Sequence, residues 1–349
     1  MRVLSDLPLW GNLGVFAVAA VLVWRMGVRL SRGADAIADR TGLGQAFVGA
    51  LLLGGTTSLP EIATTLTASI GGNAPLAVNN IFGGIALQVA ILALADALIG
   101  RRALSATQRH PGVLLEGALL VLVLTVAAAG IAVGDAVIFG VGAWTAAVAA
   151  LVVIGLFLIK HYEDQPAWRP TAEPEEQRGK ERAEEIRDRW RRRPMRSVIA
   201  NLAVACGGVF VGGFLIATTA ERIAEQTGLG AGFVGVAMVA IATSLPEVST
   251  TVEAARLGAS LMAISNIFGT NLFDSSLLFL ADIGYRGPAV LSEVGTFALV
   301  GALLGIACTT IYLAGILERH DRAFFRLGID SILVLVVYTG GMVLLYTLR

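Results

Sequence analysis

The dominant pattern along the chain is a series of apolar runs separated by polar links. Ten runs are each about as long as a helix needs to cross a hydrocarbon core roughly 30 Å thick. They cover residues 9–30, 44–70, 75–99, 112–133, 136–159, 197–220, 231–255, 261–283, 289–316 and 327–347. The pattern therefore predicts an all-α membrane protein with ten transmembrane helices.

Composition and charge agree with this reading and orient it. Of 349 residues, 56% are hydrophobic and 15% charged, against about 25% charged in soluble domains. Basic residues collect in the links after the first, third and ninth runs, and 161–196 holds ten basic and nine acidic residues. The positive-inside rule places these links in the cytoplasm and both termini outside. We expect a multi-pass protein of the plasma (inner) membrane, without a cleavable signal peptide.

The chain contains an internal duplication. Residues 41–96 align without a gap to residues 227–282, and 25 of the 56 positions are identical. Each copy carries five of the predicted spans, so the second copy enters the membrane from the opposite side. We expect two inverted five-helix repeats, at 1–160 and 197–349, joined by the charged cytoplasmic loop 161–196. Secondary transporters are built in this way, with their substrate site near the midplane where the repeats meet.

The most unusual stretch in each copy is TSLPE, which places a carboxylate directly after a proline in an apolar span: Glu61 follows Pro60, and Glu247 follows Pro246. A proline inside a helix leaves carbonyl oxygens without a partner, here around Thr57 and Thr243. In lipid such groups need partners inside the protein. An intramembrane acid is a functional candidate by default.

A second polar band lies about twenty residues later in each copy. Helical spacing puts Asn266, Thr270 and Asp274 on one face of the later band, and Asn80, Gly84 and Gln88 take the matching places in the earlier one. Both bands offer oxygen atoms, which suit hard cations such as calcium. No His or Cys approaches these faces, which argues against zinc, copper or iron.

At these residues the chain resembles the calcium/cation antiporter superfamily, and within it the sodium/calcium exchanger branch. The stretches GTTSLPE, ATSLPE and FGTNLFD carry the resemblance. It implies exchange of Ca²⁺ for monovalent cations, with Na⁺ as the first candidate, by alternating access of a site in the membrane. We expect no cofactor, no enzymatic activity and no nucleic-acid partner, and a chain that works as a monomer in the lipid bilayer.

The resemblance also assigns roles to individual residues. Glu61 and Glu247 match the two central calcium ligands, and Asp274 and Gln88 match a pair of acidic or amide residues between them. Thr57 and Thr243 match backbone-carbonyl ligands. Three hydroxyls match groups that help to form sodium sites, namely Ser58, Ser244 and Thr270.

The first copy departs from the family pattern at three positions. Gly84 stands where a serine is usual, Ile85 where an asparagine is usual, and Gln88 where Asn or Asp is usual. The loss of a hydroxyl leaves a Ca²⁺/H⁺ antiporter as the alternative. A passive cation channel and a membrane-embedded enzyme are more remote, because a channel would favour a ring of acids and an enzyme would need unequal acid and base roles.

Three acids outside this site have simpler expected roles. Asp96 and Asp282 lie at span ends, where we expect them to be solvated or to cap a helix. Glu253 lies one turn before Arg256, so an ion pair within one helix is expected.

Overall fold

The computed structural model describes the helical body of the chain. The described residues are 7–43, 45–99, 104–107, 110–164, 180–227, 244–318, 323–324 and 327–348. The predicted all-helical class is confirmed, since these residues are almost all in helices, with two short β-hairpins.

The elements follow one another in the same order in both halves. The first half contains α2 (Leu9–Thr41), α3 (Gln45–Phe47), the π-helix η1 (Val48–Gly54), α4 (Gly55–Thr57), α5 (Leu59–Ile70), α6 (Ala74–Ile99), α7 (Leu104–Thr107), α8 (Pro111–Val133), β1 (Val137–Ile138), β2 (Val141–Gly142) and α9 (Ala143–Asp164). After α10 (Lys180–Arg191), the second half contains α11 (Met195–Gln226), α13 (Leu245–Arg256), α14 (Ser260–Gly284), the short 3₁₀ helix η2 (Val290–Ser292), α15 (Thr296–Glu318), β3 (Ala323–Phe324), β4 (Leu327–Gly328) and α16 (Ile329–Thr347).

The element boundaries repeat with the same period as the sequence. α5 and α13 begin and end 186 residues apart, and α2 and α11, α6 and α14, and α9 and α16 begin 186 residues apart. The hairpin β1–β2 also recurs as β3–β4 at that spacing, with antiparallel pairing in both. Among the described elements, the duplication therefore extends beyond the 56 aligned residues to the first and last helices of each half and to the hairpins.

The membrane spans agree with the prediction in most places. Among the described residues, seven helices are long and apolar enough to cross a membrane, and the segments Ala46–Thr57 and Leu59–Ile70 pass the same test together, with a bend of 49° between them. The 25-residue α14 does not meet this test, since it carries many polar residues along its length. Much of the predicted span 231–255 lies outside the described residues, which include its end as α13.

Two predicted spans begin too early. The span predicted from 136 starts as a helix only at Ala143, because the β1–β2 hairpin precedes it and turns at Phe139 and Gly140, both with positive φ. The span predicted from 289 starts at Thr296, after the 3₁₀ turn of η2. Apolar residues in these short turns continued the hydrophobic run without continuing the helix.

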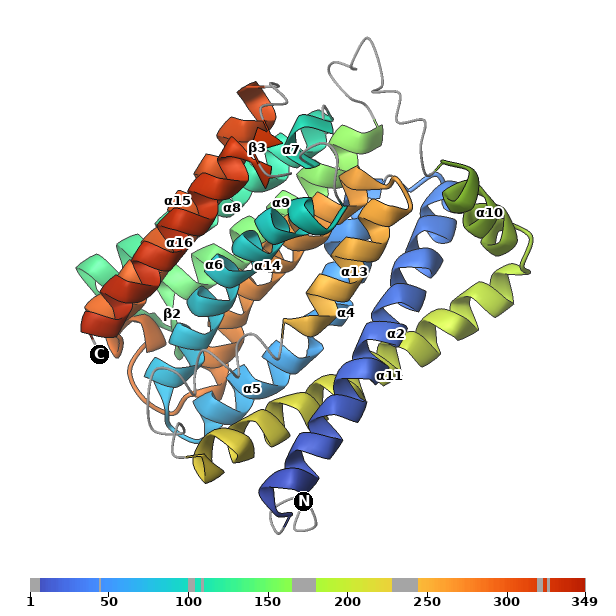
Figure 1. Ribbon diagram of the computed structural model, residues 1–349. Helices are drawn as coiled ribbons and strands as arrows, with labels where there is room; N and C mark the ends of the chain where they lie inside the picture. The colour runs from blue at the N-terminus through green and yellow to red at the C-terminus, as the bar shows by residue number, and fades with distance from the viewer. Residues whose placement is uncertain are drawn as a thin grey trace.

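The arrangement places two long helices beside a packed group of shorter ones (Figure 1). α2 and α11 cross each other at one side of the molecule, and α15 and α16 lie at the other. α14 lies between them and packs against α6, α8, α9, α13 and η1. α5 and α13 occupy opposite ends of the bundle, with α5 low and α13 high in the view. The α14 helix is thus the centre of the fold.

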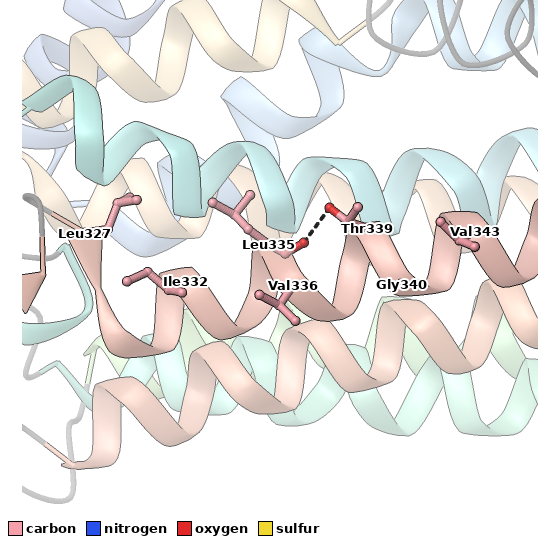
Figure 2. A pocket seen from close by; sticks show the side chains of 7 residues that line it. All are labelled: Leu327, Ile332, Leu335, Val336, Thr339, Gly340 and Val343. Carbon is pink, nitrogen blue, oxygen red and sulfur yellow. Dashed lines mark hydrogen bonds between the residues drawn. The ribbon is translucent and has the colours of Figure 1, made fainter.

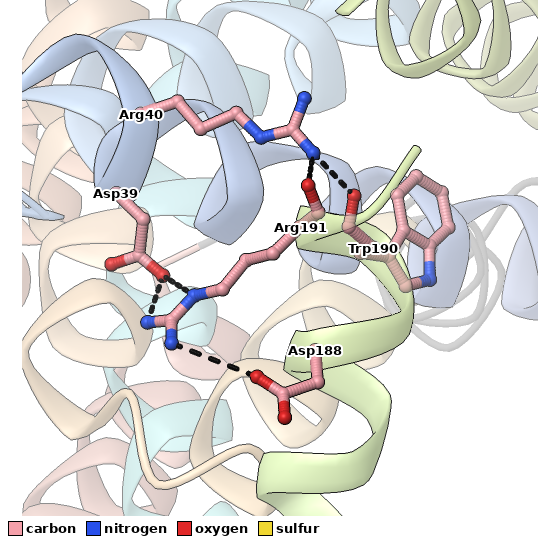
Figure 3. Close-up of polar contacts among 5 residues, drawn as sticks. All are labelled: Asp39, Arg40, Asp188, Trp190 and Arg191. Atoms are coloured by element: carbon pink, nitrogen blue, oxygen red, sulfur yellow. Dashed lines mark hydrogen bonds and ion pairs between the residues drawn. The ribbon is translucent and has the colours of Figure 1, made fainter. Parts of the chain in front are cut away.

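The linker helix α10 is attached to the end of α2 (Figure 3). Arg191 donates to Asp39 from Nη2 at 2.6 Å, and that hydrogen bond is the main cause of the raised pKa of the Arg191 guanidinium. Arg40 donates to the last carbonyls of α10, on Trp190 and Arg191. The indole of Trp190 is buried in the core. Loop 161–196 therefore contains an ordered helix that packs on the first half.

Candidate functional site

The first TSLPE stretch forms the predicted break in a helix. The chain runs through the π-helix η1 into α4, bends by 49° at Ser58, and continues as α5 with Pro60 in its first turn. The missing N–H and the ring of proline account for the break, and π-helical turns often occur at functional sites. The break places Thr57 and Ser58, both fully buried, in the interior of the protein.

The second TSLPE stretch gives the matching helix start. α13 begins directly after Ser244, with Pro246 and Glu247 in its first turn. Ser244 and Glu247 are buried. Thr243, whose carbonyl was expected to bind calcium, lies outside the described residues, so that prediction stays untested.

Three carboxyl groups come together between the two stretches. Glu61 on α5, Glu247 on α13 and Asp274 on α14 are 8%, 0% and 2% exposed. The carboxyl of Glu61 lies close enough to those of Glu247 and Asp274 for their charges to interact. Glu61 lies 186 positions from Glu247 and 213 from Asp274 in the sequence, yet the three meet in one buried place. Carboxyls this close and buried are stable only when a cation or bound protons reduce their charge.

Two hydrogen bonds join equivalent residues of the two copies. Gln88 Nε2 on α6 donates to Asp274 Oδ2 on α14 at 3.4 Å, and Asn271 Nδ2 donates to the carbonyl of Ile85 at 3.3 Å. Each of these pairs is 186 residues apart, the period of the duplication. The predicted partners Gln88 and Asp274 therefore lie in direct contact, and Asn271 is a further buried amide beside them.

The hydroxyl groups line the same space. Thr57 Oγ1 lies 3.5 Å from Thr270 Oγ1, which links the broken helix to α14. Ser58 lies beside the carboxyl of Asp274, and Thr57 beside that of Glu247. Thr270 also donates to the carbonyl of Asn266 at 2.5 Å, so back-bonding to the helix already occupies its proton and leaves its lone pairs to face a cation.

Several oxygens of this cluster have no hydrogen-bond partner. Buried atoms without one include Glu61 Oε2, both carboxyl oxygens of Glu247, Gln88 Oε1 and Asp274 Oδ1. Leaving buried acceptors unpaired costs free energy, and a bound cation is one kind of partner that such oxygens accept. The donor set, made of carboxylate, amide and hydroxyl oxygens, fits a hard cation such as calcium or sodium.

The site is not a cage of acids alone. Within the described part of the chain, no group of three or more His, Cys, Asp or Glu side chains is arranged to hold a metal ion by itself. The polar groups beside the carboxyls are the amide of Gln88 and the hydroxyls of Ser58 and Thr57. Mixed donors of moderate charge are suited to an ion that has to be released.

Close helix packing positions the two bands. A Cβ on Gly54 would lie 2.9 Å from the backbone nitrogen of Thr270, and one on Gly269 would lie 2.1 Å from the Cα of Ala50. Neither place has room for a side chain, so η1 and α14 approach each other by backbone contact. Small residues serve this purpose in membrane helices.

The structure also identifies residues that the sequence reasoning missed or misplaced. Glu116 is a fully buried acid in α8 that the prediction did not mention, although a single acid in an apolar run was the available signal. Asp282 caps as expected, accepting from the backbone of Gly142 and Val290. The predicted pair of Glu253 with Arg256 is wrong, because Glu253 pairs with Arg32 of α2 at 2.7 Å.

Two grooves on the outer surface lie away from this cluster. One, of about 430 Å³, follows α16 and is lined by Leu327, Ile332, Leu335, Val336, Thr339, Gly340 and Val343 (Figure 2). Its single hydroxyl, on Thr339, donates to the carbonyl of Leu335 in its own helix. The other lies along α2 near Trp10 and is entirely apolar. Neither groove offers ligands for an ion.

Comparison with known proteins gives a consistent relationship. The chain is 29% identical over 109 residues to the sodium/calcium exchanger MaX1 of Methanosarcina acetivorans, a match that spans 31% of each chain. It is 22% identical over 294 residues to the uncharacterized membrane protein MJ0091 of Methanocaldococcus jannaschii, covering 84% of this chain and 88% of that protein.

A solved structure shares the fold. The sodium-calcium exchanger NCX_Mj, soaked with 10 mM Na⁺ and zero Ca²⁺, superimposes with a TM-score of 0.71 at 20% identity, covering 96% of this chain and 99% of that one. The sequence profile described as sodium/calcium exchanger protein matches residues 11–160 and 197–347. Both halves of the chain are included, and only the linker is left out. The chain is therefore a membrane transporter, not an enzyme, and belongs to the sodium/calcium exchanger protein family.

Proposed function

We propose that this protein is a secondary antiporter that exchanges Ca²⁺ for monovalent cations, with Na⁺ as the first candidate. The observation that carries the proposal is the buried cluster of Glu61, Glu247 and Asp274 with its unpartnered oxygens. The ions share these ligands and compete for them. Gln88, Ser58, Ser244 and Thr270 complete the set with side-chain oxygens, and Thr57 and Thr243 with carbonyls.

The two halves form inverted five-helix repeats around a pseudo-two-fold axis. Residues on such an axis touch their own equivalents, and the Gln88–Asp274 and Ile85–Asn271 contacts have this property. Pairs off the axis should occur twice with the partners exchanged. Gly27 of α2 faces Pro246 of α13, and their equivalents Gly213 of α11 and Pro60 of α5 also face each other. The repeats then contribute ten spans in total.

Transport proceeds by alternating access, and the present conformation is accessible from the end of the bundle where α5 lies. Asn79, Asn80, Gly83 and Gly84 are half-buried there, whereas Ser265, Asn266, Gly269 and Thr270 at the equivalent places in α14 are buried. Partly exposed amides within a membrane span need water. The water-filled side is therefore that of α5.

The orientation follows the charge distribution. The beginning of α2 and the end of α16 lie at the same end of the bundle as α5 (Figure 1). This placement of the two termini supports an even number of crossings. With loop 161–196 in the cytoplasm, both termini and the open side of the site face outward. The membrane is the plasma (inner) membrane, and one chain holds both halves of the site, so the monomer is the functional unit.

The coupling to a second ion follows from charge. An empty site would leave two or three carboxylates facing one another, and carrying uncompensated ions through a dry conformation costs several kcal/mol each. One calcium or two monovalent cations neutralise Glu61 and Glu247. Loaded forms can therefore change their facing, and the empty form does so slowly. Exchange is the expected consequence.

The alternative counter-ion is the proton, and Gly84 is the observation that favours it. Its equivalent, Thr270, supplies a hydroxyl, whereas a glycine supplies none, and a Cβ at Gly84 would meet nothing within 4 Å. One monovalent site thus has fewer ligands than in family members with a serine there. We expect fewer sodium ions per cycle for that reason.

The test is calcium uptake into vesicles that contain the purified protein. Vesicles are preloaded with sodium at matched internal and external pH, and calcium is then added outside. Uptake that requires internal sodium supports the proposal. Uptake indifferent to sodium but driven by an outward proton gradient assigns the protein to Ca²⁺/H⁺ exchange, and uptake that needs neither gradient refutes antiport.

A further inference from the structure

One ion pair links a long crossing helix to the second broken helix. Arg32 Nε on α2 donates to Glu253 Oε1 on α13 at 2.7 Å, and the side chains are 32% and 7% exposed. The two helices are in tight contact just below this pair, since a Cβ on Gly27 would collide with the hydroxyl of Ser249. The ion pair therefore lies at one end of a packed interface between α2 and α13.

The equivalent place in the other half has no such pair. The equivalent of Arg32 in the other half is Thr218 on α11, and the equivalent of Glu253 is Thr67 on α5, each 186 positions away. Thr67 is exposed, and the hydroxyl of Thr218 donates to carbonyls of its own helix, on Phe214 and Leu215. Within the described residues, the ion pair thus breaks the symmetry of the fold.

The pair lies at the closed end of the bundle. Thr250 and Glu253 are buried on α13, whereas their equivalents Thr64 and Thr67 on α5 are half-buried and exposed, respectively; Thr65, like Thr251, is buried. If the second half opened as the first half does here, α13 would leave α2 and Glu253 would become hydrated. The ion pair cannot persist through that change, because its two members lie on the helices that separate.

We propose that Arg32 and Glu253 form a lock on the inner gate, which holds the protein in its outward-open conformation and must break for the site to face the cytoplasm. This inference rests on the alternating access proposed above. Because no ion pair replaces it at the outer gate among the residues that the structure describes, the lock biases the resting protein outward. Separating a largely buried carboxylate from its partner is unfavourable, while exposed pairs contribute little, so we expect about a tenfold bias for this partly buried pair.

The experiment reads conformation and needs no transport. Cys206 and Cys308, the free cysteines of the described chain, are replaced by alanine in the full-length protein. A single cysteine is then introduced at Thr64 or at the equivalent Thr250. In calcium-free vesicles, a membrane-impermeant maleimide is applied from either side and the labelling rates are measured. With the lock intact, we expect rapid outer labelling at 64 and slow inner labelling at 250.

The lock variant is Glu253→Gln, which keeps the shape and removes the charge. We expect the inner labelling rate at 250 to rise about tenfold and outer labelling at 64 to fall. Arg29→Gln is the matched control, since Arg29 is an exposed arginine on the same helix, one turn from Arg32. It should leave both rates unchanged.

The exchanged variant, Arg32→Glu with Glu253→Arg, should restore the original rates if the pair itself is responsible. Unchanged labelling in Glu253→Gln overturns the proposal. A change that Arg29→Gln reproduces, or that the exchanged variant fails to reverse, also overturns it. The uptake assay reports separately on the proposed function: a protein that exchanges no ions but shows the labelling shift keeps the lock and loses the antiport, and the converse result removes only the lock.

Discussion

The helices α5 and α13 share a sequence motif and differ in their surroundings. Both begin with Leu-Pro-Glu, so each carries a glutamate in its first turn. Thr64 and Thr250 each donate to the carbonyls of the preceding proline and glutamate in their own helix. Yet α13 is buried from Ser249 to Ala255, while the matching stretch of α5 is largely half-buried. The difference lies in how tightly each helix is covered, so one motif occurs in two different environments, which the proposed alternating access would interpret as an open and a closed gate.

The asparagines that support these helices report the same contrast. Asn266 donates to Thr250 and Thr251 at 2.9 Å each, whereas Asn80 donates to Thr64 at 3.4 Å. The residue types are equal, so the longer bond reflects the looser fit between α5 and α6. A change of facing would exchange the two arrangements. Substitutions at matched positions of the two copies can therefore test this difference.

The largest effect is expected when either copy loses its central charge. Glu61→Gln and Glu247→Gln should each reduce calcium exchange by about a hundredfold or more, because calcium affinity depends on the charge of its ligands. Both variants should stay folded, since the amide keeps the size of the side chain and removes a buried like charge. Calcium uptake, with folding checked by size-exclusion chromatography, tests this. Near-normal uptake by both variants would show that the ions bind elsewhere.

The duplication allowed much of this site to be predicted from the sequence. Gln88 and Asp274 occupy matching places in a chain that repeats at 186 residues, so the sequence identified them as equivalents, but their direct contact is visible only in the structure. The break at Ser58 followed from Pro60. The helical class and this break could be predicted because they depend on hydrophobic pattern and local chemistry, both of which are visible in the order of residues.

Other features could not be found in this way. Glu253 has Arg256 at an ideal helical spacing, but the packing of α2 on α13 brings Arg32 closer, and that packing depends on the whole bundle. The different burial of α5 and α13 is a property of one conformation, so nothing in either motif encodes it. The starts of α9, after the β1–β2 hairpin, and of α15, after η2, were predicted too early, because hydrophobicity alone does not distinguish an apolar turn from an apolar helix.

The next largest effect concerns the unequal pair Asp274 and Gln88. Glu61 and Glu247 already balance the charge of one calcium, so the third carboxyl is not needed for neutrality. Asp274→Asn should therefore lower calcium exchange by about tenfold, less than either glutamate change. The matched variant is Gln88→Asn, which keeps an amide and should have a smaller effect. Complete loss of calcium binding in Asp274→Asn would show that the aspartate is an ionised ligand.

A smaller effect is expected on stability, and it tests the contrast between the two asparagines. Asn266→Ala removes two short buried hydrogen bonds, which costs about 1–3 kcal/mol for the groups left unpaired. Asn80→Ala removes one long bond on the open side, where water can replace it, and should cost less. The thermal unfolding of the two variants in the same detergent measures the difference. Equal losses would mean that the two gates are equally closed in solution.

The smallest change makes the first copy more like the second. Gly84→Ser adds the hydroxyl that Thr270 supplies in α14, and the space around Gly84 accepts it without a clash. One added ligand at the net value of a hydrogen bond, about 0.5–1.5 kcal/mol, corresponds to about a two- to tenfold gain in sodium affinity. Sodium-dependent calcium uptake should therefore reach half of its maximum at a lower sodium concentration, with a steeper dependence if the hydroxyl completes another sodium site. Gly84→Ala is the control, since it adds bulk and helix propensity without an oxygen and should leave the sodium dependence unchanged. If serine and alanine act alike, the missing hydroxyl at Gly84 does not limit sodium binding, and the proton becomes the stronger candidate for the counter-ion.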